Sequence, residues 1–287
     1  MLTNKNNFFE VFTTKKIIES KFFNFLGLQS FRYALAKFIY VLLGFFYKNK
    51  FLTKYYDNGF YLEENFFKEE IFKKINTEFQ EAFEIHKVVR NVYEKSDNYN
   101  ENSSIDYFLY EFEDNEFNKK NFPTLYSLLS DQKIKKYFMA AERKKNINIY
   151  MRLERIKTKD FCKNDVNSYW HVDTYHNTHK AWLYLSDVTN DHGPFNYLKK
   201  SSAFSVRRLL WEFLNSIKKY FNKSYRPFFV DEKNVQTFEK NKIEVICKKN
   251  SFLIANTHGY HRRGDAKPNM VRDRISFFTR ENPFKIF

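Results

Sequence analysis

The chain has 287 residues, enough to bury a sizeable core in one large domain or two small ones. Its 49 Lys and Arg residues outnumber 34 Asp and Glu residues, which gives a net charge of +15, and 43% hydrophobic content is typical of a folded protein. Only 6 Gly, 5 Pro and 2 Cys residues exclude a collagen-like chain, a Pro/Gly-rich disordered chain and a disulfide framework.

Cellular setting follows from the same composition. Residues 1–9 are polar and lack the apolar run of a signal peptide, so a cytoplasmic protein is expected. The cysteines, Cys162 and Cys247, are expected to be inert thiols in a reducing compartment. Lys, Asn, Ile, Phe and Tyr all have A/T-rich codons, so a low-GC genome explains much of the basic charge, and no nucleic-acid partner is expected.

The first half of the chain is predicted to be mainly helical. Apolar residues recur every three or four positions in 17–47 and 63–93, and 124–144 has the pattern of another helix. The intervening stretch 93–121 is acidic and rich in Asn and Ser, which favours a loop with short helical pieces.

The most apolar stretch, 38–46, is too short to span a bilayer, which needs about 20 residues. We expect it to be part of a core helix. Basic residues around it leave a second interpretation open, in which this region lies in a membrane interface and makes peripheral membrane contact.

Strand patterns dominate from residue 146. The alternation of apolar and polar residues predicts strands at 147–156, 180–188, 243–247, 251–255 and 274–279. An amphipathic helix is predicted at 204–223. Helices first and strands later predict an α+β protein, organised as one domain with a helical region 1–145 around a strand-rich core 146–287 whose sheet is closed or sandwiched.

Candidate metal ligands lie in the strand-rich half, which holds six of the seven histidines. His171 and Asp173 are two residues apart at a predicted strand end, so they point to the same side of the chain. One distant histidine would complete a set of two imidazoles and one carboxylate, the facial triad that holds non-haem Fe(II). His258 and His261 both qualify as that distant ligand.

The order of motifs around these residues is specific. Trp170-His171-Val172-Asp173 comes first, and a strand ending in Asp187-Val188 and the turn Asn190-Asp191-His192-Gly193-Pro194 follow; His261 then precedes Arg272 by eleven residues. This order resembles the phytanoyl-CoA dioxygenase (PhyH-like) family of Fe(II)/2-oxoglutarate oxygenases over residues 146–287. One departure is Lys200-Ser201-Ser202, which stands where the family often has Gly-Ser-His.

The resemblance implies a double-stranded β-helix, a jelly-roll or cupin-like barrel. It implies that His171, Asp173 and His261 bind Fe(II) and that Arg272 binds the distal carboxylate of 2-oxoglutarate through two N–H groups. Ser276 shares the strand face of Arg272, so it is expected to reach the same carboxylate. Dioxygen is the other co-substrate, and succinate and carbon dioxide are the products.

The resemblance therefore favours a hydroxylase. Five of the 13 arginines lie in 262–280, which favours a small anionic, glycan or lipid-linked substrate; they are Arg262, Arg263, Arg272, Arg274 and Arg280. The remaining histidines of this half, His176, His179 and His192, are expected in loops near the barrel mouth. Two alternatives stay open: a non-catalytic basic module that binds nucleic acid or membrane, and a zinc hydrolase with the same triad.

Overall fold

The computed structural model describes residues 12–13, 20–46, 50–85, 90–91, 105–159, 166–222, 228–279 and 282–284. Cys162 and Arg280 lie outside these ranges. Among the described helices, none is both long and apolar enough to cross a membrane.

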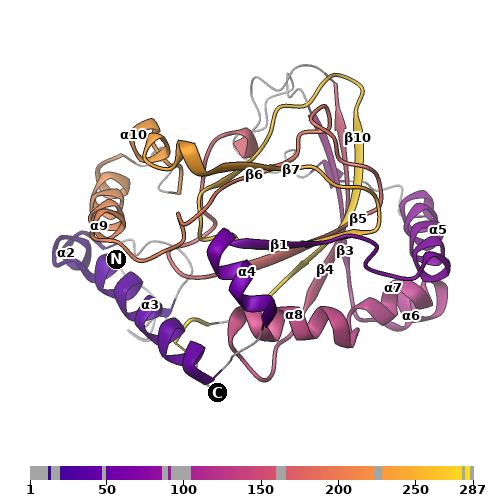
Figure 1. Ribbon diagram of the computed structural model, residues 1–287, viewed down its shortest axis with the longest axis horizontal. Coiled ribbons are helices and arrows are strands. Elements are labelled where there is room, and N and C mark those ends of the chain that lie inside the picture. The colour runs from indigo at the N-terminus through magenta and orange to yellow at the C-terminus, as the bar shows by residue number, and fades with distance from the viewer. Residues whose placement is uncertain are drawn as a thin grey trace, which may run out of the picture.

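Two antiparallel sheets form the centre of the molecule (Figure 1). The larger sheet has seven strands in the order β1-β8-β5-β10-β4-β3-β2. Their bounds are β1 Phe60–Glu63, β2 Arg90–Asn91, β3 Ile105–Phe112, β4 Tyr150–Thr158, β5 His179–Tyr184, β8 Ser251–Asn256 and β10 Val271–Phe278. The smaller sheet has the order β7-β6-β9, with bounds Lys242–Val245, Phe195–Leu198 and His261–Arg263.

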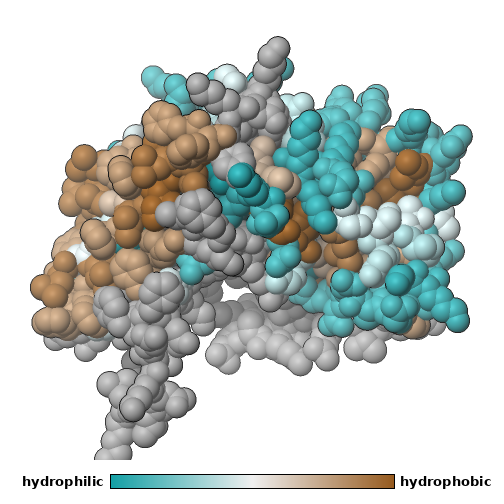
Figure 2. All heavy atoms as spheres, turned by 90° about the horizontal axis from the view of Figure 1, so that it is seen from below, coloured by the Kyte–Doolittle hydropathy of each residue, from teal (hydrophilic) through white to brown (hydrophobic). Residues whose placement is uncertain are grey.

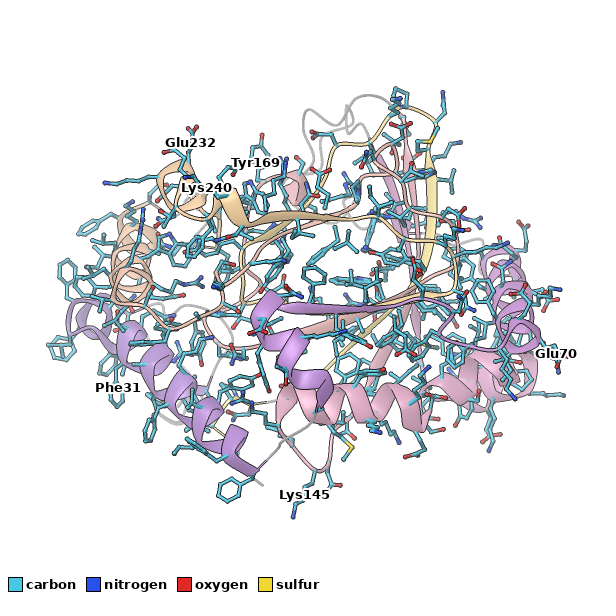
Figure 3. All side chains as sticks on the ribbon, in the orientation of Figure 1. Phe31, Glu70, Lys145, Tyr169, Glu232 and Lys240 are labelled. Carbon is cyan, nitrogen blue, oxygen red and sulfur yellow. The ribbon has the colours of Figure 1, made fainter. Side chains whose placement is uncertain are left out.

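Strand alternation gives the larger sheet two different faces. Ala181 and Leu183 of β5 point outward into one buried cluster, whereas Trp182 and Tyr184 point inward into another. The inner cluster also contains Phe195 and other residues of the smaller sheet, so the two sheets face each other across it. Side chains fill the space between the sheets in Figure 3.

Helices cover the outer face of the larger sheet. They are α4 Lys50–Asn58, α5 Glu69–Ile85, α6 Glu116–Asn121, α7 Pro123–Leu128 and α8 Gln132–Glu142. In α5, Phe72, Ile75 and Phe79 recur every three or four residues and are buried in the outer cluster. Asp131 caps α8 by accepting a hydrogen bond from the Ile134 amide at 2.9 Å. This packing follows the usual rule of an apolar stripe turned inward.

A second group of helices lies at the other end of the molecule, on the left of Figure 1. These are α2 Lys21–Phe25, α3 Leu28–Phe46 and α9 Val206–Phe221, and α3 and α2 both pack against α9. Short helical segments complete the described chain: η2 Val166–Ser168, α10 Glu232–Gln236 and η3 Glu239–Asn241.

The structure corrects several sequence predictions. Residues 38–46 do not form a core segment, because Phe38, Val41, Leu42, Phe45 and Phe46 are all exposed. The buried side of α3 is instead formed mostly by polar residues. The predicted loop region 93–121 contains the eight-residue strand β3.

The boundary at residue 145 separates helices from strands less cleanly than predicted. Strands β1, β2 and β3 come from the first half of the chain and pair with strands of the second half or with one another in a single sheet.

Candidate functional site

The segment 171–173 lies beside the segment 257–261, which brings distant residues together. The backbones of His171 and His261 exchange two N–H···O bonds of 3.0 Å, and the Asp173 amide donates to the Thr257 carbonyl at 3.0 Å. Because side chains alternate along an extended chain, His171 and Asp173 point to the same side, toward His261.

These three residues form a compact donor set. One ligand atom of each lies within 4.8 Å of the others, and Nε2 of His261 is 3.8 Å from Oδ1 of Asp173. His171 and Asp173 are half-buried and His261 is buried. Two imidazoles and one carboxylate on one side of a cavity match the donor set of a non-haem iron site.

Hydrogen bonds fix the orientation of both imidazole rings. Nδ1 of His171 donates to the Tyr169 carbonyl at 2.8 Å, and Nδ1 of His261 donates to the Gly259 carbonyl at 2.9 Å. A carbonyl only accepts, so each Nδ1 carries a proton, and Nε2 is the ring nitrogen left to bind a metal. The Tyr169 ring points away from the molecule (Figure 3).

The charges of the three residues also suit a cation. Burial and the neighbouring His171 lower the pKa of His261 to about 3, which keeps its ring neutral at physiological pH. Burial opposes ionisation of Asp173, but Lys180 and the two histidines hold its pKa below the usual range. Nζ of Lys180 is 2.9 Å from Oδ2 of Asp173. A neutral His261 ring and an ionised Asp173 carboxylate are protonation states that a metal needs, so the donor set fits a divalent ion.

His258 lies in a different environment from His261. It is fully buried, its Nδ1 donates to the Thr174 carbonyl at 3.0 Å, and its ring stacks on Tyr33 with centroids 5.7 Å apart. Among the described residues that line the cavity, His261 is present and His258 is not. The geometry therefore favours His261 as the distant ligand.

The three residues open into a cavity between the two sheets, and its lining is strongly basic. Six basic side chains face two acidic ones: Arg152, Lys180, Arg262, Arg263, Arg272 and Arg274 against Glu154 and Asp173. Aromatic rings, including Trp182 and Phe195, supply much of the remaining wall. Such a cavity suits a small anionic molecule.

Arg272 and Arg274 lie on the same face of β10, yet their surroundings differ. Nε of Arg274 pairs with Oε2 of Glu154 at 2.5 Å, directly across the strand pair. Arg272 is buried and donates to the Gly193 carbonyl, and no carboxylate of the described residues lies within ion-pair distance. Burial and Arg274 lower the pKa of Arg272 to about 9. An anion in the cavity would relieve this uncompensated charge.

Ser276 follows on the same strand face. It is buried and lines the cavity together with both arginines. The placement expected from strand alternation is therefore observed for Arg272, Arg274 and Ser276.

Three further histidines, His176, His179 and His192, were expected in loops near the barrel mouth, and of these His179 lies instead at the start of β5. His176 and His179 are almost fully buried, with Nδ1 of His179 3.1 Å from Oε1 of Glu142, and His192 lies in a turn beside Thr189. None of the three is among the described residues that line the cavity.

Other lining residues were missed by sequence reasoning. Arg152, Glu154 and Ile156 occupy alternate positions of a predicted strand, so period-two spacing would have placed them together. Tyr107 had no such signal, because its strand β3 was not predicted.

Comparison with known proteins gives structural matches only. No protein-family model matches the chain, and no curated protein matches it. HygX from Streptomyces hygroscopicus, solved with nickel and 2-oxoglutarate, is 13% identical, with a TM-score of 0.51 over 81% of this chain and 86% of its own. The epimerase SnoN, in complex with Fe3+, alpha ketoglutarate and nogalamycin RO, is 11% identical, with a TM-score of 0.54 over 80% and 82%.

A third solved structure, AviO1 from Streptomyces viridochromogenes Tue57, is 11% identical, with a TM-score of 0.50 over 80% of this chain and 93% of its own. The chain shares the fold of HygX and SnoN. At these identities the likeness establishes the fold alone, a mixed helix and antiparallel-sheet architecture.

Proposed function

We propose that the protein is an Fe(II)- and 2-oxoglutarate-dependent dioxygenase that hydroxylates a small anionic, glycan or lipid-linked substrate. The observation that carries this proposal is Arg272, a buried arginine without a carboxylate partner among the described residues, in the same cavity as the His171, Asp173 and His261 donor set. A buried cation beside a metal site is what a dicarboxylate co-substrate requires.

The solved structures that share the fold add support. HygX was crystallised with nickel and 2-oxoglutarate, and SnoN with Fe3+ and alpha ketoglutarate. We also infer that the two facing sheets form a double-stranded β-helix of jelly-roll type. Membership of the phytanoyl-CoA dioxygenase family remains a prediction from motif order.

In this proposal His171, Asp173 and His261 hold the iron, and Arg272, with Ser276 beside it, binds the distal carboxylate of 2-oxoglutarate. Bound iron(II) supplies dioxygen activation, with oxidation of 2-oxoglutarate to succinate and carbon dioxide. The carbonyls of Tyr169 and Gly259 keep the imidazole rings in the ligating tautomer.

Two further features of the cavity serve the reaction. Lys180 holds Oδ2 of Asp173 at 2.9 Å, which leaves Oδ1, on the side of His261, as the oxygen that would bind iron. The aromatic walls of the cavity limit the access of water to the reacting groups, which prevents side reactions with water.

The substrate class is inferred from the cavity charge. Arg262 and Arg263 line the cavity from the smaller sheet, opposite the arginines of β10. HygX and SnoN were crystallised with hygromycin B and nogalamycin RO, respectively, which is consistent with a glycan-type substrate here.

The proposal is tested by metal analysis and by succinate release from 2-oxoglutarate. His171→Ala and Asp173→Ala should bind iron weakly and release no succinate, because each removes one of three protein ligands. His258→Gln is the matched control: it alters a buried histidine outside the donor set, so the folded fraction should keep iron and activity.

Succinate release at the wild-type rate by Asp173→Ala would show that the triad is misassigned. Tight zinc binding without succinate release under any iron concentration would favour the zinc hydrolase instead. Absence of both metal binding and turnover would favour a non-catalytic binding module.

A further inference from the structure

Helix α9 is amphipathic, but its polar side faces the protein. Arg208 and Glu212 are buried, with 3% and 1% exposure, and Asn215 and Ser216 are buried beside them. Leu210 and Leu214, one helical turn apart, are instead 56% and 51% exposed. This is the reverse of an ordinary surface helix, whose apolar stripe faces the core.

Helices α2 and α3 show the same reversal. Asn24 of α2 and Gln29, Arg32 and Lys37 of α3 are buried. The exposed residues of these two helices and of the turn between them, which contains Leu26, are mostly large and apolar: Phe22, Phe25, Leu26, Phe31, Phe38, Val41, Leu42, Phe45 and Phe46. Phe31 points away from the protein in Figure 3.

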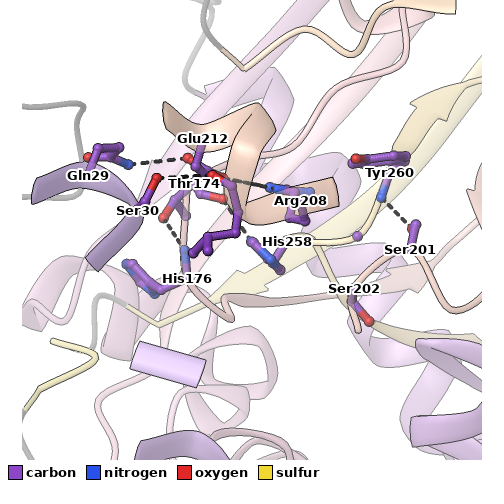
Figure 4. Close-up of polar contacts among 12 residues, drawn as sticks. Gln29, Ser30, Thr174, His176, Ser201, Ser202, Arg208, Glu212, His258 and Tyr260 are labelled. Carbon is purple, nitrogen blue, oxygen red and sulfur yellow. Dashed lines mark hydrogen bonds and ion pairs between the residues drawn. The ribbon is translucent and has the colours of Figure 1, made fainter. Parts of the chain in front are cut away.

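Polar contacts join the three helices to one another and explain the reversal, and Figure 4 shows those between α3 and α9. Glu212 accepts a hydrogen bond from Gln29 at 3.2 Å and pairs with Arg208 at 3.0 Å. Asn24 donates to the Ser216 carbonyl at 3.4 Å, and Ser30 donates to the Leu209 carbonyl at 3.0 Å. Since the polar sides are satisfied against each other, the apolar sides are left outward.

The outward side chains form one apolar face. We define it as the exposed residues of α2 and α3 given above together with Phe204 and, on α9, Val206, Leu210, Leu214 and Phe221. Figure 2 shows these hydrophobic residues gathered at the end of the molecule where the three helices lie, whereas the opposite end is mostly hydrophilic. A contiguous exposed face of this kind marks an interaction surface.

The exposed charges that the three helices themselves carry are basic. Residues 20–56 contain no Asp or Glu, and the single acidic residue of α9, Glu212, is buried. Arg207 and Lys218 are exposed on α9. A second copy of the chain would bring the same positive charges together, whereas anionic lipid headgroups would neutralise them.

We propose that the apolar face of α2, α3 and α9 docks on an anionic lipid bilayer, with the helices lying in the plane of the membrane. The phenylalanines and leucines enter the boundary between headgroups and acyl chains, and the basic residues contact the headgroups. This proposal does not depend on the proposed catalytic function.

The test is flotation of the full-length protein with phosphatidylcholine vesicles and with mixed phosphatidylcholine–phosphatidylglycerol vesicles. The protein should float with the mixed vesicles. The double variant Leu210→Ser and Leu214→Ser should bind at least about tenfold more weakly, because two side chains lose their transfer from water. The matched control is Ile71→Ser with Ile85→Ser on α5, which removes two residues that are 42% and 58% exposed elsewhere; it should bind like the wild type.

Thermal unfolding of both double variants verifies that they fold, and light scattering reports their oligomeric state. Failure of the wild type to float with either vesicle would overturn the proposal. A dimer in solution that the α9 variant converts to monomer, without vesicle binding, would assign the face to a second copy instead. Equal loss of vesicle binding in the α9 and α5 double variants would also contradict the proposal, because the effect would then not be specific to the apolar face.

Discussion

Arg272 and Arg274 are two residues apart on one strand and differ mainly in what compensates their charge. Glu154 neutralises Arg274 at 2.5 Å, and its carboxylate raises the pKa of that guanidinium. Arg272 has the Gly193 carbonyl as an acceptor and has a lowered pKa. Burying a cation without a counter-ion costs free energy, so the Arg272 site is stabilised when an anion enters.

This contrast predicts different outcomes for the same substitution. Arg272→Lys keeps the charge but loses the planar pair of donors, so the KM for 2-oxoglutarate should rise at least about tenfold, equivalent to roughly 1.4 kcal/mol. Arg274→Lys keeps a charge beside Glu154 and should change this KM much less. Steady-state succinate release measures both. A large effect of Arg274→Lys with none for Arg272→Lys would move the anchor to Arg274.

At the scale of the element, the buried polar side of α9 makes the helix sensitive to loss of one charge. Glu212→Ala leaves Arg208 and Gln29 without their shared acceptor. We expect the free energy of unfolding to fall by about 3–5 kcal/mol, as for other buried pairs broken on one side. Urea denaturation measures it, and Glu81→Ala, an exposed position on α5, is the control.

A double variant, Arg208→Met with Glu212→Leu, removes both charges and should be more stable than Glu212→Ala. If the double variant is the less stable of the two, the ion pair itself, rather than the cost of an unpaired charge, holds the three helices together.

The same elements define what the sequence could and could not predict. Alternation predicted β4, β5, β8 and β10, and three of these, β4, β5 and β10, carry most of the cavity lining. The two-residue spacing of His171 and Asp173 predicted two members of the donor set, whereas the choice of His261 over His258 came from the family resemblance. Strands β1, β6 and β9 were not predicted as strands, and each has only three or four residues, which leaves little alternation to detect; β7, of the same length, was nevertheless predicted.

Helix α3 was predicted as a helix, but the prediction of which side is buried was wrong. The spacing of apolar residues shows that a helix has two sides, and only the packing partner decides which side is buried. Here the partner is the polar side of α9, so Gln29 and Arg32 face inward and Phe38 faces outward.

For the whole molecule, binding of nickel(II) and 2-oxoglutarate should raise the melting temperature, Tm. If the proposed site is correct, the residues that would hold nickel(II) and 2-oxoglutarate come from both sheets, His261 from β9 and Arg272 from β10. At about a hundred times its dissociation constant a ligand adds about 2.7 kcal/mol, and for a chain of this size Tm should rise by roughly 4–5 °C. Scanning calorimetry measures the change. Arg272→Lys should keep the rise from nickel alone and lose most of that from 2-oxoglutarate; an unchanged Tm in the wild type would contradict the site.

The strand order of the larger sheet has a consequence for how the chain can be divided. β1 lies on the outer side of β8, and β3 lies on the outer side of β4, so each protects a row of backbone groups of the second half. Cleavage at residue 145 would leave β8, whose residues are all buried, and β4 as open edges. Open edges of this kind template aggregation. The second half carries the proposed iron site, yet it should be insoluble when it is expressed by itself. Addition of the first half as a separate chain should restore solubility only if β1 pairs with β8 and β3 pairs with β4.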